Sequence, residues 1–140
     1  MGGLQMAIAN PYASTYKQNT TATASPGELT LMLYNGCLKF INQAKKAIDA
    51  GDIQAKNTNI IKAQDIIREL MVTLKTDNEL GKEMMRLYDF ILNKLVEANL
   101  KNDLGALGEA EQFVTEFRDT WKEVVKADRV QRHGTELKKA

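Results

Sequence analysis

Residues 23–34, which read TASPGELTLMLY, predict where the first helix of the fold begins. The side chain of Ser25 can accept a hydrogen bond from the backbone N–H of Glu28, and the Glu28 side chain can reach back to the backbone N–H of Ser25, which together form a capping box. Pro26 takes the first helical position, where its missing N–H costs nothing. Because these start signals agree on one register, the sequence predicts a helix that begins at Pro26.

Apolar residues then recur at helical spacing in four segments joined by short polar turns. The predicted helices cover Pro26–Ala50, residues 53–75, Glu79–Leu100, and Leu104 to about Lys126. Their stripes step by three and four, which is typical of nearly antiparallel packing, and no run alternates with a period of two. The predicted core stripes are Leu29, Leu33, Cys37, Phe40, Ala44 and Ala47; Ile60, Ala63, Ile67, Leu70 and Leu74; Leu80, Met84, Leu87, Tyr88, Ile91 and Leu95; and Leu107, Ala110, Val114, Phe117, Trp121 and Val124. The expected fold is all-α, an antiparallel up-down-up-down four-helix bundle.

The segment before the first helix is rich in small polar residues and is predicted to form a flexible N-terminal arm, residues 1–24. Met6 could be the natural start, in which case residues 1–5 are an addition ahead of it; the sequence leaves open whether they are native. Ile8, Tyr12 and Tyr16 are spaced by four and would share one face of a helix. Two interpretations stay open: a disordered arm, or an arm that docks these three side chains on the bundle.

The boundary between the bundle and the C-terminal tail follows from where the apolar stripe of the fourth predicted helix ends. Residues 25–127 form the predicted bundle, and residues 128–140 form a charged C-terminal tail in which the helix is expected to fray. A length of 140 residues fits this single domain.

Composition narrows the possible partners and the compartment. Lys and Arg number 19 against 18 Asp and Glu, so the net charge of +1 gives no reason to expect nucleic acid as a partner. No apolar run reaches the roughly 18 residues of a membrane span, so membrane insertion is not expected. Cys37 is the sole cysteine and lies in an apolar stripe, where we expect a buried, inert thiol. A missing secretory signal and a lone cysteine both favour a cytoplasmic location.

The sequence lacks the patterns that catalytic and metal-binding bundles require. A di-iron bundle needs two Glu-x-x-His pairs, whereas this chain has one histidine, His133, which lies in the predicted tail. The same position argues against a histidine phosphotransfer domain. No phosphate loop, zinc spacing or nucleophile motif is present, so we expect no catalytic residue, no metal, no cofactor and no enzymatic activity. The remaining option is a surface that binds another protein.

Five apolar residues fall outside the core stripes, on the flanks of the second and third predicted helices. Ile61 and Val72 align on one flank of the second helix, and Met85, Leu92 and Val96 gather on one flank of the third. If the two flanks face each other, they form a groove that can bury an amphipathic partner helix. The alternative, which spacing alone leaves open, is that these residues are wide edges of the core.

Several motifs together resemble the FliS family of flagellar export chaperones. The likeness covers about Asn10 to Val125, in the family's order and spacing. The residues that carry it are Asn10-Pro11-Tyr12, Tyr16, Thr23-Ala24-Ser25-Pro26, Leu29, Met32-Leu33-Tyr34, Gly36, Leu87-Tyr88, Ala98-Asn99 and Trp121. Asn35 departs from the acidic residue of many members, and the tail from Asp128 has no usable counterpart.

The resemblance implies a cytoplasmic, non-enzymatic bundle that binds the disordered C-terminal segment of flagellin. Members of the family keep flagellin from polymerising prematurely and support its delivery to a flagellar type III export gate component. The bound segment folds short helices into apolar grooves of the bundle. The resemblance also implies that the N-terminal arm can lie over part of that surface when the client is absent, which favours docking through Ile8, Tyr12 and Tyr16.

Overall fold

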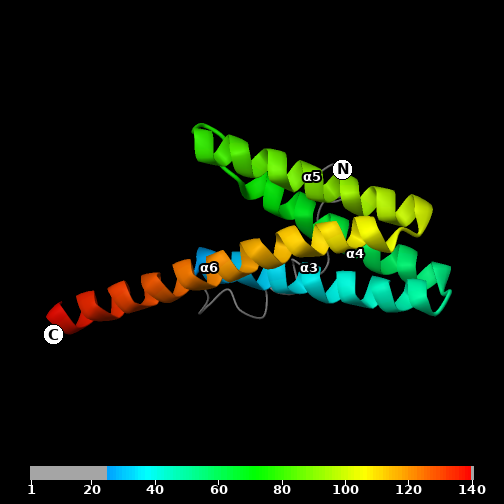
Figure 1. Cartoon of the computed structure of the whole chain (residues 1–140). Coiled ribbons are helices and arrows are strands. Elements are labelled where there is room, and N and C mark those ends of the chain that lie inside the picture. The colour runs from blue at the N-terminus through cyan, green and yellow to red at the C-terminus, as the bar shows by residue number, and fades with distance from the viewer. Residues whose placement is uncertain (1–24, 140) are drawn as a thin grey trace, which may run out of the picture.

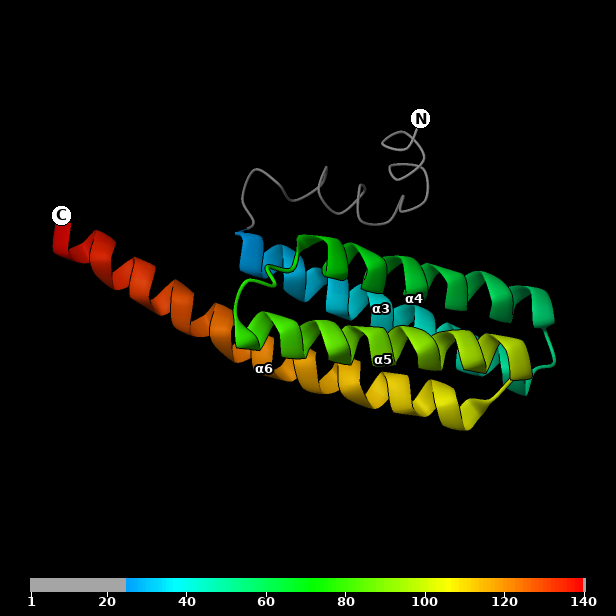
Figure 2. The same ribbon diagram turned by 90° about the horizontal axis from the view of Figure 1, so that it is seen from above.

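The computed structural model describes residues 25–139, with side chains to residue 134. Within this range the chain forms α3 (Pro26–Asp49), α4 (Ile53–Thr73), α5 (Glu79–Lys101) and α6 (Leu104–Lys139), and no strand (Figure 1). α3 packs against α4 and α6, and α5 packs against the same two helices from the other side (Figure 2). The predicted antiparallel four-helix bundle is therefore confirmed. The arm residues Ile8, Tyr12 and Tyr16 lie outside the described residues.

Side chains that precede each helix fix where it begins. The Oγ of Ser25 accepts from the Glu28 N–H at 3.2 Å, and the Glu28 Oε1 accepts from the Ser25 N–H at 3.1 Å. The predicted capping box is thus present. Asp52 caps α4 and Asn78 caps α5 in the same manner, each accepting a backbone N–H with its side-chain oxygen. These caps pair N–H groups that would otherwise lack a partner in the first turn of a helix.

All four helices contribute to one core, and most residues of the predicted stripes lie in it. The least exposed large side chains are Tyr34, Ile41, Ile60, Ile66, Ile67, Ile91, Leu95, Leu107 and Val114. Cys37 is also fully buried, as predicted.

Two residues predicted for the core lie instead at the surface. Leu80 is 72% exposed and Val124 is 46% exposed. The arrangement of the helices explains the exposure of Leu80. The α4–α5 pair diverges from the α3–α6 pair at the end where α3 begins (Figure 1). Leu80 lies in the first turn of α5, at this open end, so the stripe continues there although no layer covers it.

The last helix is longer than predicted. Its stripe fades near Lys126, but α6 continues to Lys139 and projects beyond the rest of the bundle (Figures 1 and 2). Arg129 and Arg132 both form ion pairs with Glu28 at the start of α3, and Arg132 also pairs with Asp128 within the helix. These ion pairs stabilise the part of α6 beyond Lys126, in which no apolar stripe is present.

Candidate partner-binding surface

The antiparallel register of α4 and α5 determines which predicted site residues can meet. The Nζ of Lys56 donates to the backbone oxygen of Asn99 at 2.6 Å, although Lys56 is only 3% exposed. From this point each step forward along α4 matches a step back along α5. Ile61 therefore lies at about the level of Val96, and Val72 lies at about the level of Met85.

The two predicted residues of α4 face solvent. Ile61 is 47% exposed and Val72 is 65% exposed, opposite the buried face that faces the core. The edge of α4 that faces α3 is marked by Lys62, whose Nζ lies 5.4 Å from the centroid of the Phe40 ring. At about 100° per residue, Ile61 and Val72 follow on the outer side, away from this edge and toward α5.

The three predicted residues of α5 lie along the edge that faces α4. The other edge faces α6, because Phe90 packs edge-on against Phe113 at 5.2 Å and Lys94 pairs with Glu109 at 3.7 Å. Helical spacing places the predicted residues on the opposite side, and all three are half-buried: Met85, Leu92 and Val96. Leu92 also packs against the buried core.

Two further apolar residues extend this surface, and the sequence interpretation missed both. Ile53 is 48% exposed and Leu100 is 78% exposed. Ile53 precedes Lys56 by nearly one turn and Leu100 follows Asn99, so the Lys56–Asn99 bond places them at a common level. Ile53 is the first residue of α4, and Leu100 lies in the last turn of α5. At the end of a helix, the spacing of apolar residues cannot distinguish a core residue from a surface residue. We call the whole set the α4–α5 apolar row: Ile53, Ile61, Val72, Met85, Leu92, Val96 and Leu100.

Charged groups interrupt the row near its middle. Asp65 and Arg68 form an ion pair at 3.4 Å on α4, and burial raises the pKa of the Asp65 carboxyl, an effect that the Arg68 charge opposes. Asp89 is exposed on α5. A partner of this surface would therefore have to combine apolar side chains with groups that can face these charges.

A hollow opens at the divergent end of the bundle, apart from the row. It is a cavity of about 220 Å³ with a lining drawn from all four helices: Thr30, Tyr34, Leu70, Thr73, Leu74, Met84, Tyr88 and Trp121. The hydroxyls of Tyr34 and Tyr88 meet at 2.5 Å, and burial raises the pKa of both phenols, so they stay neutral at physiological pH. The sequence interpretation assigned Leu74, Met84 and Trp121 to a closed core and so missed this cavity.

Reactive and metal-ligating side chains are the other candidates for a functional site among the described residues. Burial raises the pKa of the Cys37 thiol to about 12, which leaves no thiolate to act as a nucleophile. Within residues 25–134, no three metal-ligating side chains cluster in a way that could hold an ion. His133 is exposed on α6. The described helices also contain no segment with the length and apolar character required to cross a bilayer.

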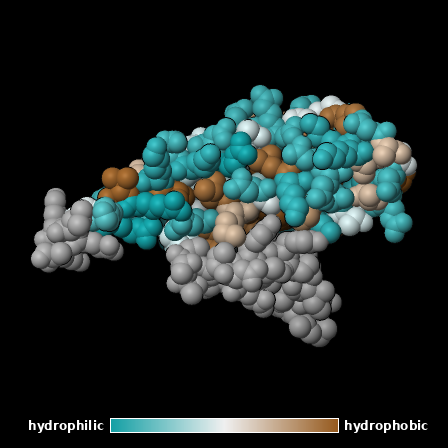
Figure 3. Space-filling model, turned by 90° about the horizontal axis from the view of Figure 1, so that it is seen from below, coloured by the Kyte–Doolittle hydropathy of each residue, from teal (hydrophilic) through white to brown (hydrophobic). Residues whose placement is uncertain are grey.

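The opposite face of the molecule differs in character. Figure 3 shows this side, on which α3 and α6 lie, and its visible part carries mainly hydrophilic side chains. The apolar side chains on it form small, separate patches. Scattered patches of this kind are normal for a protein surface.

Comparison with known proteins places this geometry in a family. The family model described as Flagellar protein FliS matches residues 8–128. The chain belongs to the FliS family. Flagellar secretion chaperone FliS of Bacillus subtilis (strain 168) is 55% identical over 130 residues, covering 93% of this chain and 97% of that protein. The Escherichia coli (strain K12) protein of the same name is 31% identical over 115 residues, covering 80% and 85%.

A solved structure supports the fold of this FliS-family member. A crystal structure described as a flagellar chaperone from bacteria superposes with a TM-score of 0.69 at 19% identity, over 81% of this chain and 94% of that one. The resemblance read from the sequence is thereby confirmed at the level of family and fold. The family is one of flagellar secretion chaperones and is not known for enzymes.

Proposed function

We propose that this protein is a cytoplasmic, non-enzymatic export chaperone for flagellin. It binds the disordered C-terminal segment of flagellin, prevents premature polymerisation and supports delivery to a component of the flagellar type III export gate. The observation that carries the proposal is the exposed α4–α5 apolar row on a bundle whose relatives are named flagellar secretion chaperones.

The physical basis is the burial of apolar surface on both partners. An apolar client segment that polymerises with its own kind is hidden when it folds against the row as an amphipathic helix. Coupled folding of this type typically buries about 1,000–3,000 Å² and spends several kcal/mol on ordering the segment. This ordering cost weakens the complex relative to its contact area, so a large interface remains releasable at the export gate.

The first test changes the two well-exposed residues of the row that were predicted on α4. The double variant Ile61→Asp with Val72→Asp changes side chains that are 47% and 65% exposed, so the bundle is expected to stay folded. Val130→Asp is the matched control, because Val130 is 68% exposed on α6, far from the row. Calorimetric titration with a peptide of the flagellin C-terminal segment should show at least about tenfold weaker binding for the double variant, and unchanged binding for the control.

Two results would overturn the proposal. One is the absence of measurable binding between the unmodified protein and the peptide at tens of micromolar. The other is unchanged affinity in the double variant while circular dichroism shows an intact fold, which would move the client away from the α4–α5 apolar row.

The N-terminal arm is the second element of the proposal. If Ile8, Tyr12 and Tyr16 dock on the client surface, the arm lowers the apparent affinity by the fraction of molecules that are closed. Deletion of residues 6–20 should then tighten peptide binding or leave it unchanged. A large loss of affinity would instead make the arm part of the binding site.

A further inference from the structure

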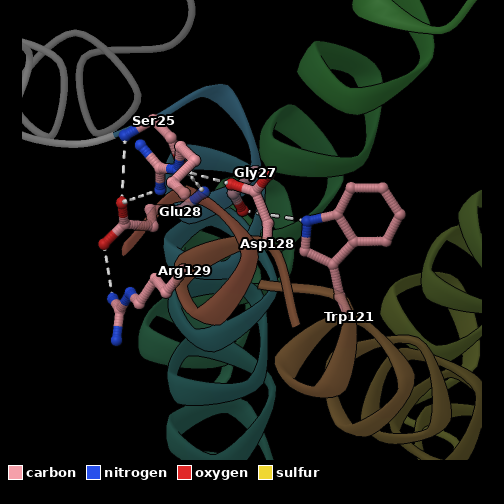
Figure 4. Close-up of polar contacts among 7 residues, drawn as sticks. Ser25, Gly27, Glu28, Trp121, Asp128 and Arg129 are labelled. Carbon is pink, nitrogen blue, oxygen red and sulfur yellow. Dashed lines mark hydrogen bonds and ion pairs between the residues drawn. The ribbon is translucent and has the colours of Figure 1, made fainter. Parts of the chain in front are cut away.

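The projecting part of α6 is attached to the first turn of α3. We call residues 122–139 the α6 extension. Each residue from 126 to 133 is exposed, so no buried apolar face holds this stretch against the bundle. Its position depends on contacts that successive turns of α6 make with Gly27 and Glu28 in the first turn of α3 (Figure 4).

The first of these contacts is apolar with one hydrogen bond. The indole N–H of Trp121 donates to the backbone oxygen of Gly27 at 2.9 Å. One turn later, Val125 is 5% exposed, and a Cβ placed on Gly27 would lie 3.5 Å from its side chain. The α6 extension therefore leaves the bundle in close contact with the start of α3.

The next two turns contribute charge. Arg129 donates to Oε2 of Glu28, and Arg132 lies 3.9 Å from Oε1 of the same carboxylate. The bond from Arg129, followed by the bonds from Ser25, lowers the pKa of Glu28 to about 2. Glu28 is thus ionised throughout the physiological range and holds both arginines.

The same carboxylate also closes the helix cap. Oε1 of Glu28 accepts the backbone N–H of Ser25, the residue that follows the arm, while Oε2 binds Arg129 (Figure 4). If Ser25 leaves its capping position, the Glu28 side chain loses the bond from the Ser25 N–H that helps to orient it. If Arg129 leaves, the cap loses the cation that fixes its carboxylate. Coupling between two contacts through one group acts equally in both directions.

We propose that Glu28 is a relay that couples the helix cap at Ser25 to the order of the α6 extension. While the cap at Ser25 is closed, the extension is held against the bundle. When the cap opens, the extension is released and its helix frays. The state of the start of α3 is thereby transmitted to the end of α6.

Two variants separate the relay from simple capping. Glu28→Gln keeps a capping box, which accepts Gln as well as Glu, but removes the charge that binds the arginines. Ser25→Ala removes the side chain that accepts from the Glu28 N–H but leaves the charge in place. Glu123→Gln is the matched control, because it removes one exposed negative charge on α6 itself. All are made in the full chain, and amide hydrogen exchange is followed by NMR.

The relay predicts a distinct pattern of exchange. Glu28→Gln should raise the exchange of amides 126–133 about two- to fivefold, the range expected for loss of exposed ion pairs. Ser25→Ala should raise exchange at the start of α3 and also in amides 126–133. Glu123→Gln should leave amides 126–133 at the wild-type rate.

Three outcomes would overturn the relay. The first is unchanged exchange of the extension in Glu28→Gln, which would show that the carboxylate does not hold it. The second is faster exchange confined to the start of α3 in Ser25→Ala, which would show a cap with no link to α6. The third is an equal rise in Glu123→Gln, which would assign the effect to net charge.

Discussion

Replacement of Lys56 tests how α4 and α5 are held in register under the apolar row. Its side chain is 3% exposed and its ammonium donates to the Asn99 oxygen at 2.6 Å. Asn99 lies in the last turn of α5, where carbonyls lack partners within the helix. The bond therefore satisfies a carbonyl and places a cation at the negative end of the helix.

The magnitude follows from what each substitution removes. Lys56→Met keeps most of the buried stem and deletes the charged hydrogen bond, so a loss of about 1.5–3 kcal/mol in the free energy of unfolding is expected. Lys56→Ala also removes three buried methylene groups at about 0.8 kcal/mol each, which raises the expected loss to roughly 4–5 kcal/mol.

Urea denaturation followed by circular dichroism measures both values. Lys46→Met is the control, because Lys46 is exposed on α3. This substitution should change the free energy of unfolding by no more than about 0.5 kcal/mol. If Lys56→Met were as stable as the wild type, the desolvation of the ammonium would cancel its bond, and the explanation of the register would be wrong.

Three further predictions concern the divergent end of the bundle. Tyr34→Phe should cost about 1–3 kcal/mol in unfolding free energy, because it leaves the buried Tyr88 hydroxyl unpaired, and the double change to Phe should recover part of that loss. Gly81→Ala should cost about 1–3 kcal/mol, since its Cβ would lie 1.8 Å from the Lys75 carbonyl oxygen and the α4–α5 connection must move; an unchanged urea midpoint would refute this. The pKa of Glu28 lies near 2 in the folded state against 4.5 in the free group, so its stabilising effect is present above pH 4.5 and is lost as pH falls toward 2. The stability difference between wild type and Glu28→Gln should therefore vanish near pH 2, and a difference that persists there would contradict the assignment.

The features that the sequence predicted best are those decided within a few residues. The capping box needs only Ser25 and Glu28, three positions apart, and its bonds form as expected. The stripes likewise fix which face of each helix is buried, because helical spacing acts over single turns. Helix starts and most core residues followed from such local rules.

Features decided by distant residues could not be predicted in this way. Whether Leu80 is covered depends on how far α4–α5 diverges from α3–α6, which no local spacing reveals. The bond from Trp121 to Gly27 joins residues that are 94 positions apart. The length of α6 depends in the same way on the ion pairs of Arg129 and Arg132 with Glu28, since the local stripe had already ended.

Leu92 shows why the binding surface and the core cannot be separated by sequence alone. It lies on the α5 edge of the apolar row and also packs against the buried core. A charge at this position would weaken folding and binding together, so loss of a partner would not locate the site. Ile61 and Val72 lack this double role, because both are well exposed on the outer side of α4. A substitution at these two positions changes the proposed client surface and leaves the packing beneath it intact, which is why they carry the decisive test.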